Sequence, residues 1–379
     1  MQLTYTEEQT MLRDAVSAFL ADTYDIDKRR TALDQEPGWR PDIWQSLAQE
    51  LGLLGAAFPE ELGGFGGGAT EHLLLMEEFG RSLVVEPYLS TVVLGGGFLK
   101  YSGYAGAAAL IEEIVSGEAI LAFAQAERGS RYNLACVETR ATADADGWVL
   151  DGHKKLVISA PFATHLIVTA RTAGDRRDKD GISIFLLDRN TPGVSLQEYK
   201  TYDGFLAADV AFANVKLGKE TLMGDLNNGL PLVERVVDEA TAALCGEAAG
   251  VLEQLLNRTV EYAKERKQFG RPIGSFQALQ HRMADMFVEV EQATSMAISA
   301  AIATGDDDPV SRSRKISIAK AQIGNALRKV GQGAIQIHGG MGMTQEMPIS
   351  QYFKRATILE NMFGSVDYHL QRIENLSPV

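Results

Sequence analysis

Apolar residues recur at helical spacing from Thr6 to about Lys100. The segment TEEQTMLRDAVSAFLADTY starts with Thr6 three residues before Gln9, which is the arrangement of a capping box at a helix N-terminus. The glycine-rich residues 58–70, FPEELGGFGGGAT, follow no strand-like pattern and precede no Gly-Lys-Ser/Thr triplet. We therefore interpret them as a connection between helices and not as a phosphate-binding loop.

The hydrophobic period changes near Glu118. Short β-branched or alternating segments follow one another, separated by Gly, Pro, Asp and Asn, as is typical of consecutive antiparallel strands. These segments are AILAFAQAE, WVLDGHKKLVIS, HLIVTART, GISIFLLD and DVAFANVKL. Helical spacing then returns from about Gly229 to the end. This order predicts an α+β fold with an N-terminal helical domain over 1–116, a middle antiparallel β-domain over 117–226 and a C-terminal helical domain over 227–379.

Composition and charge narrow the class of protein. A chain of 379 residues, 45% of them hydrophobic, is long enough for two or three domains. The net charge of -14 argues against a nucleic acid or an anionic membrane surface as the main partner, because both attract basic proteins. Two distant cysteines, Cys136 and Cys245, indicate neither a disulfide framework nor a metal cluster. The N-terminus has no signal-peptide pattern and no apolar run reaches the ~18 residues of a membrane span, so we expect a cytoplasmic protein.

Two segments near the C-terminus carry a recognisable pattern. Residues 262–286, YAKERKQFGRPIGSFQALQHRMADM, combine a helix end, a turn with Gly270 and Pro272, and a second helix. Together with residues 334–344, AIQIHGGMGMT, they resemble the flavin-binding signature and the Gln-x-x-Gly-Gly segment of the acyl-CoA dehydrogenase family. The resemblance extends over the chain, from LTYTEEQTMLRD and LGLLGAAFPEELGG to DRNTPGV and MGDLNNGLPLV.

The resemblance implies a protein that holds FAD with side chains from two subunits. Arg266 offers a planar guanidinium fork to a pyrophosphate, and Gly339 with Gly340 lets the backbone approach a ligand closely. Carried over by position, the residues expected to hold the FAD of a neighbouring subunit are Arg266, Gln268, Phe269, Ile273, Phe276, Gln336, Gly339 and Gly340. The resemblance therefore also implies a homo- or hetero-oligomer, with a four-helix bundle as the C-terminal domain.

The proton-accepting residue of the family is missing from its usual place. Family members remove the α-proton of an acyl-CoA with a glutamate between an aromatic residue and a Gly-Thr pair, at a fixed distance after an arginine. In RATILENMFGSVDYHL, counting from Arg355 without a gap puts Gly364 on this position, whereas matching the Gly-Ser pair with Gly-Thr puts Phe363 there. Neither residue can accept a proton, and assigning Glu360 or Asp367 breaks both alignments.

A second position, used for the base by some branches of the family, holds no carboxylate either. Aligning back from Arg266 puts Ala240 on it. Glu239 is one residue away and about 100° round the helix, whereas Glu247 lies within about 20° of the direction of Ala240 but roughly 10 Å further along the axis. Glu247 is therefore either a buried glutamate with a structural partner or a relocated base, and both interpretations stay open.

Three further differences affect the contacts that a family member makes with its own flavin and thioester. In AQAERGSRYN, Ala126 replaces a flavin-contacting threonine, although Ser130 remains as a candidate substrate contact. Leu156 begins a Leu-Val-Ile-Ser segment where the family has Trp-x-Thr-Asn against the flavin. Thr241 stands where many members have a CoA-contacting arginine. The residues expected to contact a neighbouring subunit's FAD are therefore kept. The residues expected to contact the chain's own flavin and thioester are altered.

These features lead to three hypotheses. The first is a heteromeric FAD-dependent acyl-CoA dehydrogenase, in which this chain, most similar to the small-subunit type of pimeloyl-CoA dehydrogenase, completes the FAD site of a paralogous subunit that bears the base. The second is a homomeric dehydrogenase that uses Glu247 or another base. The third is a flavin-binding or assembly scaffold without turnover, because a fold does not guarantee its usual activity. Both enzymatic hypotheses imply an acyl-CoA substrate and an electron-transfer flavoprotein as electron acceptor.

Overall fold

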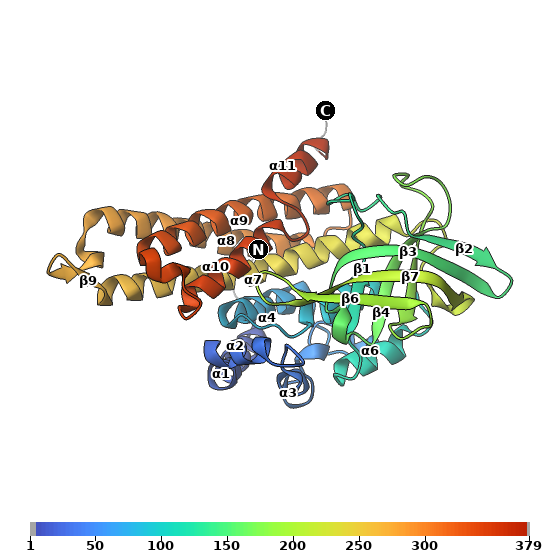
Figure 1. Cartoon of the computed structure of the whole chain (residues 1–379), viewed down its shortest axis with the longest axis horizontal. Helices are drawn as coiled ribbons and strands as arrows, with labels where there is room; N and C mark the ends of the chain where they lie inside the picture. Colours follow the sequence, from blue (N-terminus) through green and yellow to red (C-terminus); the bar gives the residue numbers. More distant parts are fainter. Residues whose placement is uncertain (1–4, 377–379) are drawn as a thin grey trace. The chain divides into compact units, whose positions relative to one another are not determined.

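The computed structural model describes residues 5–376 and divides into two compact units (Figure 1). The first, which we call the helical unit, comprises the described residues of Met1–Asp34, Ala69–Val84 and Thr241–Val379. The second, which we call the sheet unit, comprises Gln35–Gly68 and Val85–Ala240. The division into domains 1–116, 117–226 and 227–379 stays a prediction, because the two units regroup segments of the N-terminal third of the chain.

The helical unit is built from long helices and one small hairpin. The predicted capping box is confirmed: the Oγ1 atom of Thr6 accepts from the backbone N–H of Gln9, and the side chain of Gln9 accepts from the N–H of Thr6, both at 3.1 Å. Its elements are α1 (Glu7–Thr23), α2 (Ile26–Asp34), α4 (Ala69–Ser82), most of α7 (Leu230–Glu265), β9 (Lys267–Gln268), β10 (Arg271–Pro272), α8 (Gln277–Ala303), α9 (Pro309–His338), α10 (Pro348–Asn361) and α11 (Val366–Asn375).

Glycine residues allow α4 and α7 to cross closely within this unit. An ideal Cβ atom on Gly80 would lie 2.1 Å from the carbonyl oxygen of Glu247, and one on Gly250 would lie 2.0 Å from that of Glu77. No side chain fits at such distances, so these positions need glycine. On the other side of the unit, α9 packs against α8, α10 and α11. The helical unit thereby fixes where Glu247 and the end of α10 lie.

The sheet unit contains one mixed sheet with short helices. The expected strands correspond to β1, β3, β4, β5 and β7, whereas the sequence pattern did not reveal β2, β6 and β8. The elements are α3 (Pro41–Gln45), α5 (Gly96–Tyr101), α6 (Ala107–Val115), β1 (Leu121–Ala124), β2 (Arg140–Asp144), β3 (Gly147–Ile158), β4 (His165–Arg171), β5 (Ile182–Asp188), β6 (Val194–Lys200), β7 (Leu206–Gly218) and β8 (Leu222–Met223). Residues 58–70 connect helical turns to α4, as predicted.

The strands follow the order β6-β7-β3-β2-β4-β5-β8, with β1 paired to β4. Most pairings are antiparallel, as predicted, but β1 runs parallel to β4 and β2 meets β4 in parallel at one pair of residues. A parallel pair needs a long connection, which the chain through β2 and β3 supplies between β1 and β4. Nearly every residue of β4 and β5 is buried, so their patterns are continuously apolar, whereas β6 lies at the edge and is partly exposed.

Among the described residues, the helices include none that is both long and apolar enough to cross a membrane. Cys136 and Cys245 are free, buried thiols. Within the same part of the chain, no group of His, Cys, Asp and Glu side chains has the arrangement of a metal site.

Candidate functional site

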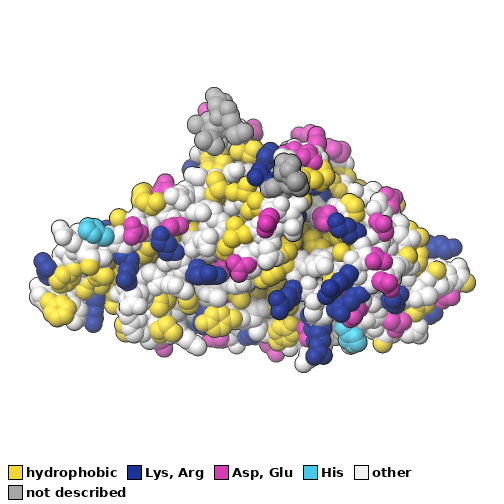
Figure 2. Space-filling view, turned by 90° about the horizontal axis from the view of Figure 1, so that it is seen from above, with side chains coloured by type: hydrophobic (Ala, Val, Ile, Leu, Met, Phe, Trp, Pro, Cys, Tyr) yellow, Lys and Arg dark blue, Asp and Glu magenta, His cyan; other side chains and the backbone are white. Residues whose placement is uncertain are grey.

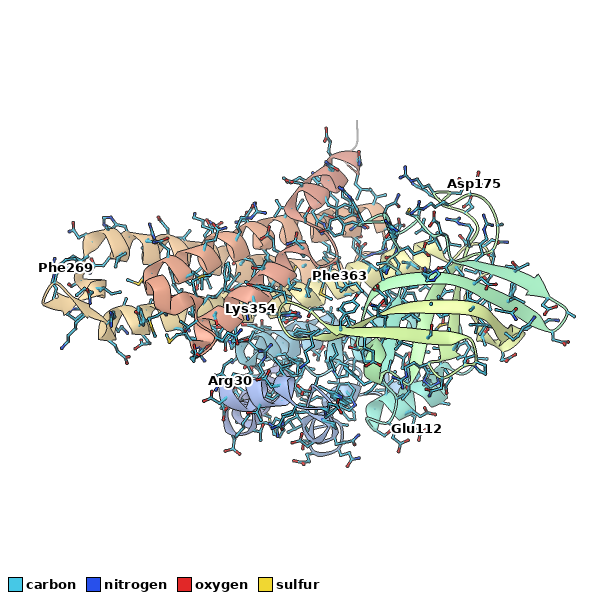
Figure 3. The ribbon with its side chains drawn as sticks, in the orientation of Figure 1. Arg30, Glu112, Asp175, Phe269, Lys354 and Phe363 are labelled. Carbon is cyan, nitrogen blue, oxygen red and sulfur yellow. The ribbon has the colours of Figure 1, made fainter. Side chains whose placement is uncertain are left out.

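The flavin-binding signature folds as a tight hairpin at the end of α7. Its strands pair Gln268 with Arg271, and the turn between them consists of Phe269 and Gly270, whose φ angles are 53° and 79°. Two successive left-handed residues are typical of a two-residue hairpin turn. This conformation places Phe269 at the tip, where 92% of its surface is exposed (Figure 3). An aromatic side chain held out in this way is available to a ligand or a second chain.

Cationic and aromatic groups surround this hairpin. Arg266 and Gln268 are exposed, and within the described chain the guanidinium of Arg266 has no hydrogen bond or ion pair with another side chain. The guanidinium of Arg271 lies 4.1 Å from the ring centroid of Phe276, which in turn meets Phe269 edge to face at 6.1 Å. Ile273 is buried beneath the turn. The hairpin therefore offers an unpaired cation for a phosphate and apolar faces for a ring system.

The second signature ends α9 beside the end of α7. The ring of Tyr262 on α7 stacks on His338 of α9 at a centroid distance of 4.2 Å, which brings the two signatures to the same end of the helical unit. Gln336, two residues before His338, is exposed. A Cβ atom added to Gly339 or Gly340 would meet nothing within 4 Å, so neighbouring atoms do not require glycine there. The open space beside this backbone is what a closely approaching ligand would need.

Apolar side chains gather over this end of the helical unit. Figure 2 shows them at the left-hand end of the view, where β9 and β10 lie in Figure 1. The exposed large hydrophobic residues of the two signatures and of the adjoining first half of α8 are Phe269, Phe287, Val288, Met341 and Met343. An apolar patch of this kind marks a contact surface.

Glu247, the candidate relocated base, lies in a buried ion pair. Its Oε1 atom accepts from Nε of Arg355 at 2.5 Å, and its Oε2 atom accepts from Nη2 of Arg355 at 2.8 Å. Both side chains are almost wholly buried, so α7 and α10 are joined by a two-point contact. Glu239, which belongs to the sheet unit, instead accepts from the hydroxyl of Tyr101 at 2.7 Å and from Arg235 at 2.9 Å. Each carboxylate thus has a structural partner.

Phe363 and Gly364, the two candidate base positions from the sequence, lie in the turn between α10 and α11. Phe363 has a φ angle of 59° and is partly exposed, whereas Gly364 has a φ angle of 134° and is buried. Neither side chain can accept a proton. Figure 3 shows Phe363 and Phe269 far apart along the helical unit, so the turn and the hairpin occupy different regions of it.

The sheet-unit segment around Ser130 is held by its own hydrogen bonds. The hydroxyl of Ser130 accepts from the N–H of Glu127 at 3.0 Å and donates to its carbonyl at 2.9 Å, within a buried turn. The carboxylate of Glu127 also pairs with the buried Lys154 at 2.7 Å. Burial lowers the pKa of Lys154 to about 8, although Glu127 opposes that shift. The hydroxyl of Ser130 is therefore already engaged within the chain.

The segment that begins at Leu156 presents an aliphatic surface. Leu156 is 54% exposed with a φ angle of 51°, and its N–H donates to Oδ1 of Asp209 at 3.2 Å. Ser159 is buried and accepts from the hydroxyl of Ser90 at 2.9 Å. No described side chain within residues 156–159 is aromatic, so this segment cannot stack a planar ring as a tryptophan does.

Family models identify the chain. Models of the N-terminal, middle and C-terminal domains of acyl-CoA dehydrogenase match residues 6–118, 122–215 and 227–375. The chain belongs to the acyl-CoA dehydrogenase family. The members of this family are FAD-dependent enzymes.

Relatives match this acyl-CoA dehydrogenase over nearly its whole length. The probable acyl-CoA dehydrogenase YngJ of Bacillus subtilis is 30% identical, with 98% of each chain covered. A solved Tcur3481-Tcur3483 steroid ACAD is 30% identical, with 98% of this chain and 97% of that chain covered and a TM-score of 0.87. The ChsE4-ChsE5 complex of Mycobacterium tuberculosis is 27% identical, with all of each chain covered and a TM-score of 0.87.

Sequence reasoning missed two buried side chains next to Gly364. Lys320 of α9 and His369 of α11 are 2% and 1% exposed. The signal for Lys320 was its place in the apolar stripe of α9 with Ile316, Ile323 and Leu327. No comparable signal marked His369, because the pattern of α11 is short and mostly polar.

Proposed function

We propose that this chain is the base-lacking subunit of a heteromeric acyl-CoA dehydrogenase and that its hairpin end completes the FAD site of a paralogous, base-bearing subunit. The observation that carries the proposal is the turn after α10. Its two candidate base positions hold Phe363 and Gly364, and no carboxylate of the turn occupies either place. Glu247, the carboxylate considered as a relocated base, is engaged by Arg355 through both of its oxygens.

The ion pair makes Glu247 a poor general base. Both of its carboxylate oxygens accept hydrogen bonds from Arg355 and are therefore directed at that guanidinium and not toward a substrate. It is also almost fully buried, whereas a base must reach the proton that it removes. The competing proposal, a homomer in which Glu247 is the relocated base, therefore requires the contact with Arg355 to open during the reaction.

The residues at the hairpin end fit a dinucleotide held from outside the chain. Arg266 is exposed and has no side-chain partner in the described structure, so it can take a pyrophosphate without losing another contact. Gln268 and Gln336 would add amide donors, Gly339 and Gly340 would allow close approach, and Phe269, Ile273 and Phe276 would provide apolar contacts. When bound, FAD supplies the acceptor of the hydride that leaves the β-carbon of the thioester.

In this account the chain binds the cofactor and shields it from water, and the partner subunit takes the proton. Arg266 and the glutamines position the cofactor, while the apolar patch around Phe269 excludes water at the subunit contact. The α-proton goes to the carboxylate of the base-bearing subunit. This chain lacks the groups that would serve a second site of the same kind. Ala126 has no hydroxyl, Leu156 has no aromatic face and Thr241 has no guanidinium.

The finer assignments belong to the same proposal. The small-subunit type of pimeloyl-CoA dehydrogenase is the nearest likeness that the motifs suggest, and an electron-transfer flavoprotein is the proposed electron acceptor. Two of the solved relatives pair two unlike chains in their names, the Tcur3481-Tcur3483 steroid ACAD and the ChsE4-ChsE5 complex. Their pairing supports a heteromer here. As substrate we propose a fatty-acyl or sterol side-chain thioester.

Co-expression tests the proposal. The chain purified alone is expected to contain little FAD and to turn over no acyl-CoA. Co-expression with a gene-neighbouring paralogue that has a Glu before Gly-Thr is expected to give a yellow, active heteromer. Full FAD occupancy and turnover by the isolated chain would instead support the homomer. A colourless, inactive co-complex, or a flavin-bound co-complex without turnover, would leave the scaffold as the better explanation.

A further inference from the structure

A buried lysine lies directly behind the turn at the base position. The ammonium group of Lys320 donates to the carbonyl of Glu360 at 2.9 Å and to the carbonyl of Gly364 at 3.1 Å. These carbonyls lie on either side of the turn between α10 and α11. Within the described chain, the ammonium of Lys320 has no carboxylate as hydrogen-bonding partner, because the carboxylate of Glu360 pairs with Arg328.

Burying this ammonium group is unfavourable unless hydrogen bonds compensate for its lost hydration. Burial lowers the pKa of Lys320 to about 8, while Cys245 and Glu360 oppose that shift. The last carbonyls of a helix have no partner within the helix and attract a cation. Lys320 therefore compensates for part of its desolvation by satisfying the carbonyl of Glu360 at the end of α10 and that of Gly364 in the turn before α11. The two contacts fix the spacing of the turn's ends.

The other constraint on the turn comes from α11. A Cβ atom on Gly364 would lie 2.4 Å from Cδ1 of Tyr368 and 2.5 Å from Nε2 of His369, and the φ angle of 134° strains any other residue. His369 is buried, and the backbone of Phe363 faces its ring although neither ring nitrogen makes a well-formed hydrogen bond in the described chain. A side chain at position 364 would thus point into filled space.

We propose that Lys320 is the positioning residue of this turn. With the turn held in this way and no space beside Gly364, position 363 is the only one of the two candidate base positions that can carry a side chain. Position 363 is then where a base-bearing subunit carries its glutamate, and Phe363 is the group that replaces it here. This inference rests on the proposed function for the meaning of the position. Its test does not, because it measures the turn in the isolated chain.

Cysteine labelling can measure the turn, since both native cysteines are buried. The unmodified chain is expected to react with a thiol reagent only after unfolding, and Phe363→Cys to react in the folded state. Adding Lys320→Met to Phe363→Cys should raise the labelling rate by about tenfold or more. Loss of the two hydrogen bonds from Lys320 to the backbone lets the turn open locally. The matched control is Lys329→Met in the same background, since Lys329 lies exposed on α9 and pairs with Glu289.

A second reporter separates positioning from general stability. Leu370→Cys places a thiol at an exposed position of α11, and its labelling rate should not change with Lys320→Met. If Lys320→Met does not fold, Lys320→Gln keeps one donor for a carbonyl and should give an intermediate rate. Equal labelling rates of Phe363→Cys with Lys320 and with Lys320→Met would overturn the role of Lys320. Folded-state labelling of Gly364→Cys, with unchanged stability, would overturn the assignment of position 363.

Discussion

At the scale of single residues, the arginines of the chain serve opposite purposes. Arg355 is buried and donates two hydrogen bonds to Glu247. Arg266 is exposed and has no side-chain partner among the described residues. The motif around Arg266 predicts a ligand-binding role for it, and this role stays a prediction. The sequence could not decide between structural and catalytic roles for Glu247, since the partner lies more than a hundred positions away in the sequence.

The role of Arg266 can be measured in the co-expressed heteromer. Arg266→Ala is expected to weaken FAD binding by about 1.5 to 3 kcal/mol, because one charge-assisted contact with a phosphate is lost. Titration of the apoprotein with FAD gives the affinity, and circular dichroism checks that the helix is intact. Lys264→Ala is the matched control, because Lys264 is exposed at the same helix end and pairs with Glu261. Equal FAD affinities for the two variants would contradict the assignment.

Replacing the missing base by one substitution is expected to fail. Phe363→Glu should fold but give no dehydrogenation by the isolated chain, because Ala126, Leu156 and Thr241 have also removed contacts to flavin and thioester. A misplacement of about 1 Å can cost roughly a hundredfold in rate. Gly364→Glu should lower the unfolding temperature as well, since Tyr368 and His369 occupy its space. Measurable turnover by Phe363→Glu alone would mean that the chain's own site is otherwise complete.

At the scale of elements, periodicity predicted helices and long strands well and predicted their partners poorly. The capping box at Thr6 and the turn at Gly270 depend on local chemistry and were both predicted, whereas the strands β9 and β10 on either side of that turn were not. β2 and β6 are largely exposed, so their patterns lack the apolar signal of β4 and β5. The parallel pairing of β1 depends on distant contacts, which a local pattern does not encode.

The packing of α11 on α9 should depend on pH through His369. Burial, with Lys320 and Arg372 nearby, lowers the pKa of His369 to about 3 in the folded chain, below its ordinary value. Between that pKa and the ordinary value the unfolded chain binds more protons, so stability falls as the pH falls. His369 should contribute up to about 1.4 kcal/mol per pH unit in this range.

Urea unfolding of His369→Gln and the unmodified chain, at several values between pH 4 and pH 7, tests this contribution. The difference in unfolding free energy between the two should shift in favour of the variant as the pH falls. Parallel curves would show that His369 titrates normally and is not held neutral by its surroundings.

At the scale of the whole molecule, the sequence predicted the order of helices and strands and the family. It did not predict the two compact units, because α4 joins the C-terminal helices through glycine contacts that no local pattern announces. Within the helical unit, the FAD signature and the base-position turn lie far apart, as Figure 3 shows for Phe269 and Phe363. One chain can therefore keep the first feature while losing the second, which is the division of labour that we propose.

The most direct test of that division compares two glutamate variants in the co-expressed heteromer. Turnover of acyl-CoA per bound FAD is measured for Glu247→Gln in this chain and for the corresponding Glu→Gln change at the base of the paralogue. The account predicts that the paralogue variant loses activity, whereas Glu247→Gln keeps it wherever folding and FAD content are retained. Loss of turnover in Glu247→Gln, with folding and FAD content unchanged, would contradict the account and make Glu247 the base.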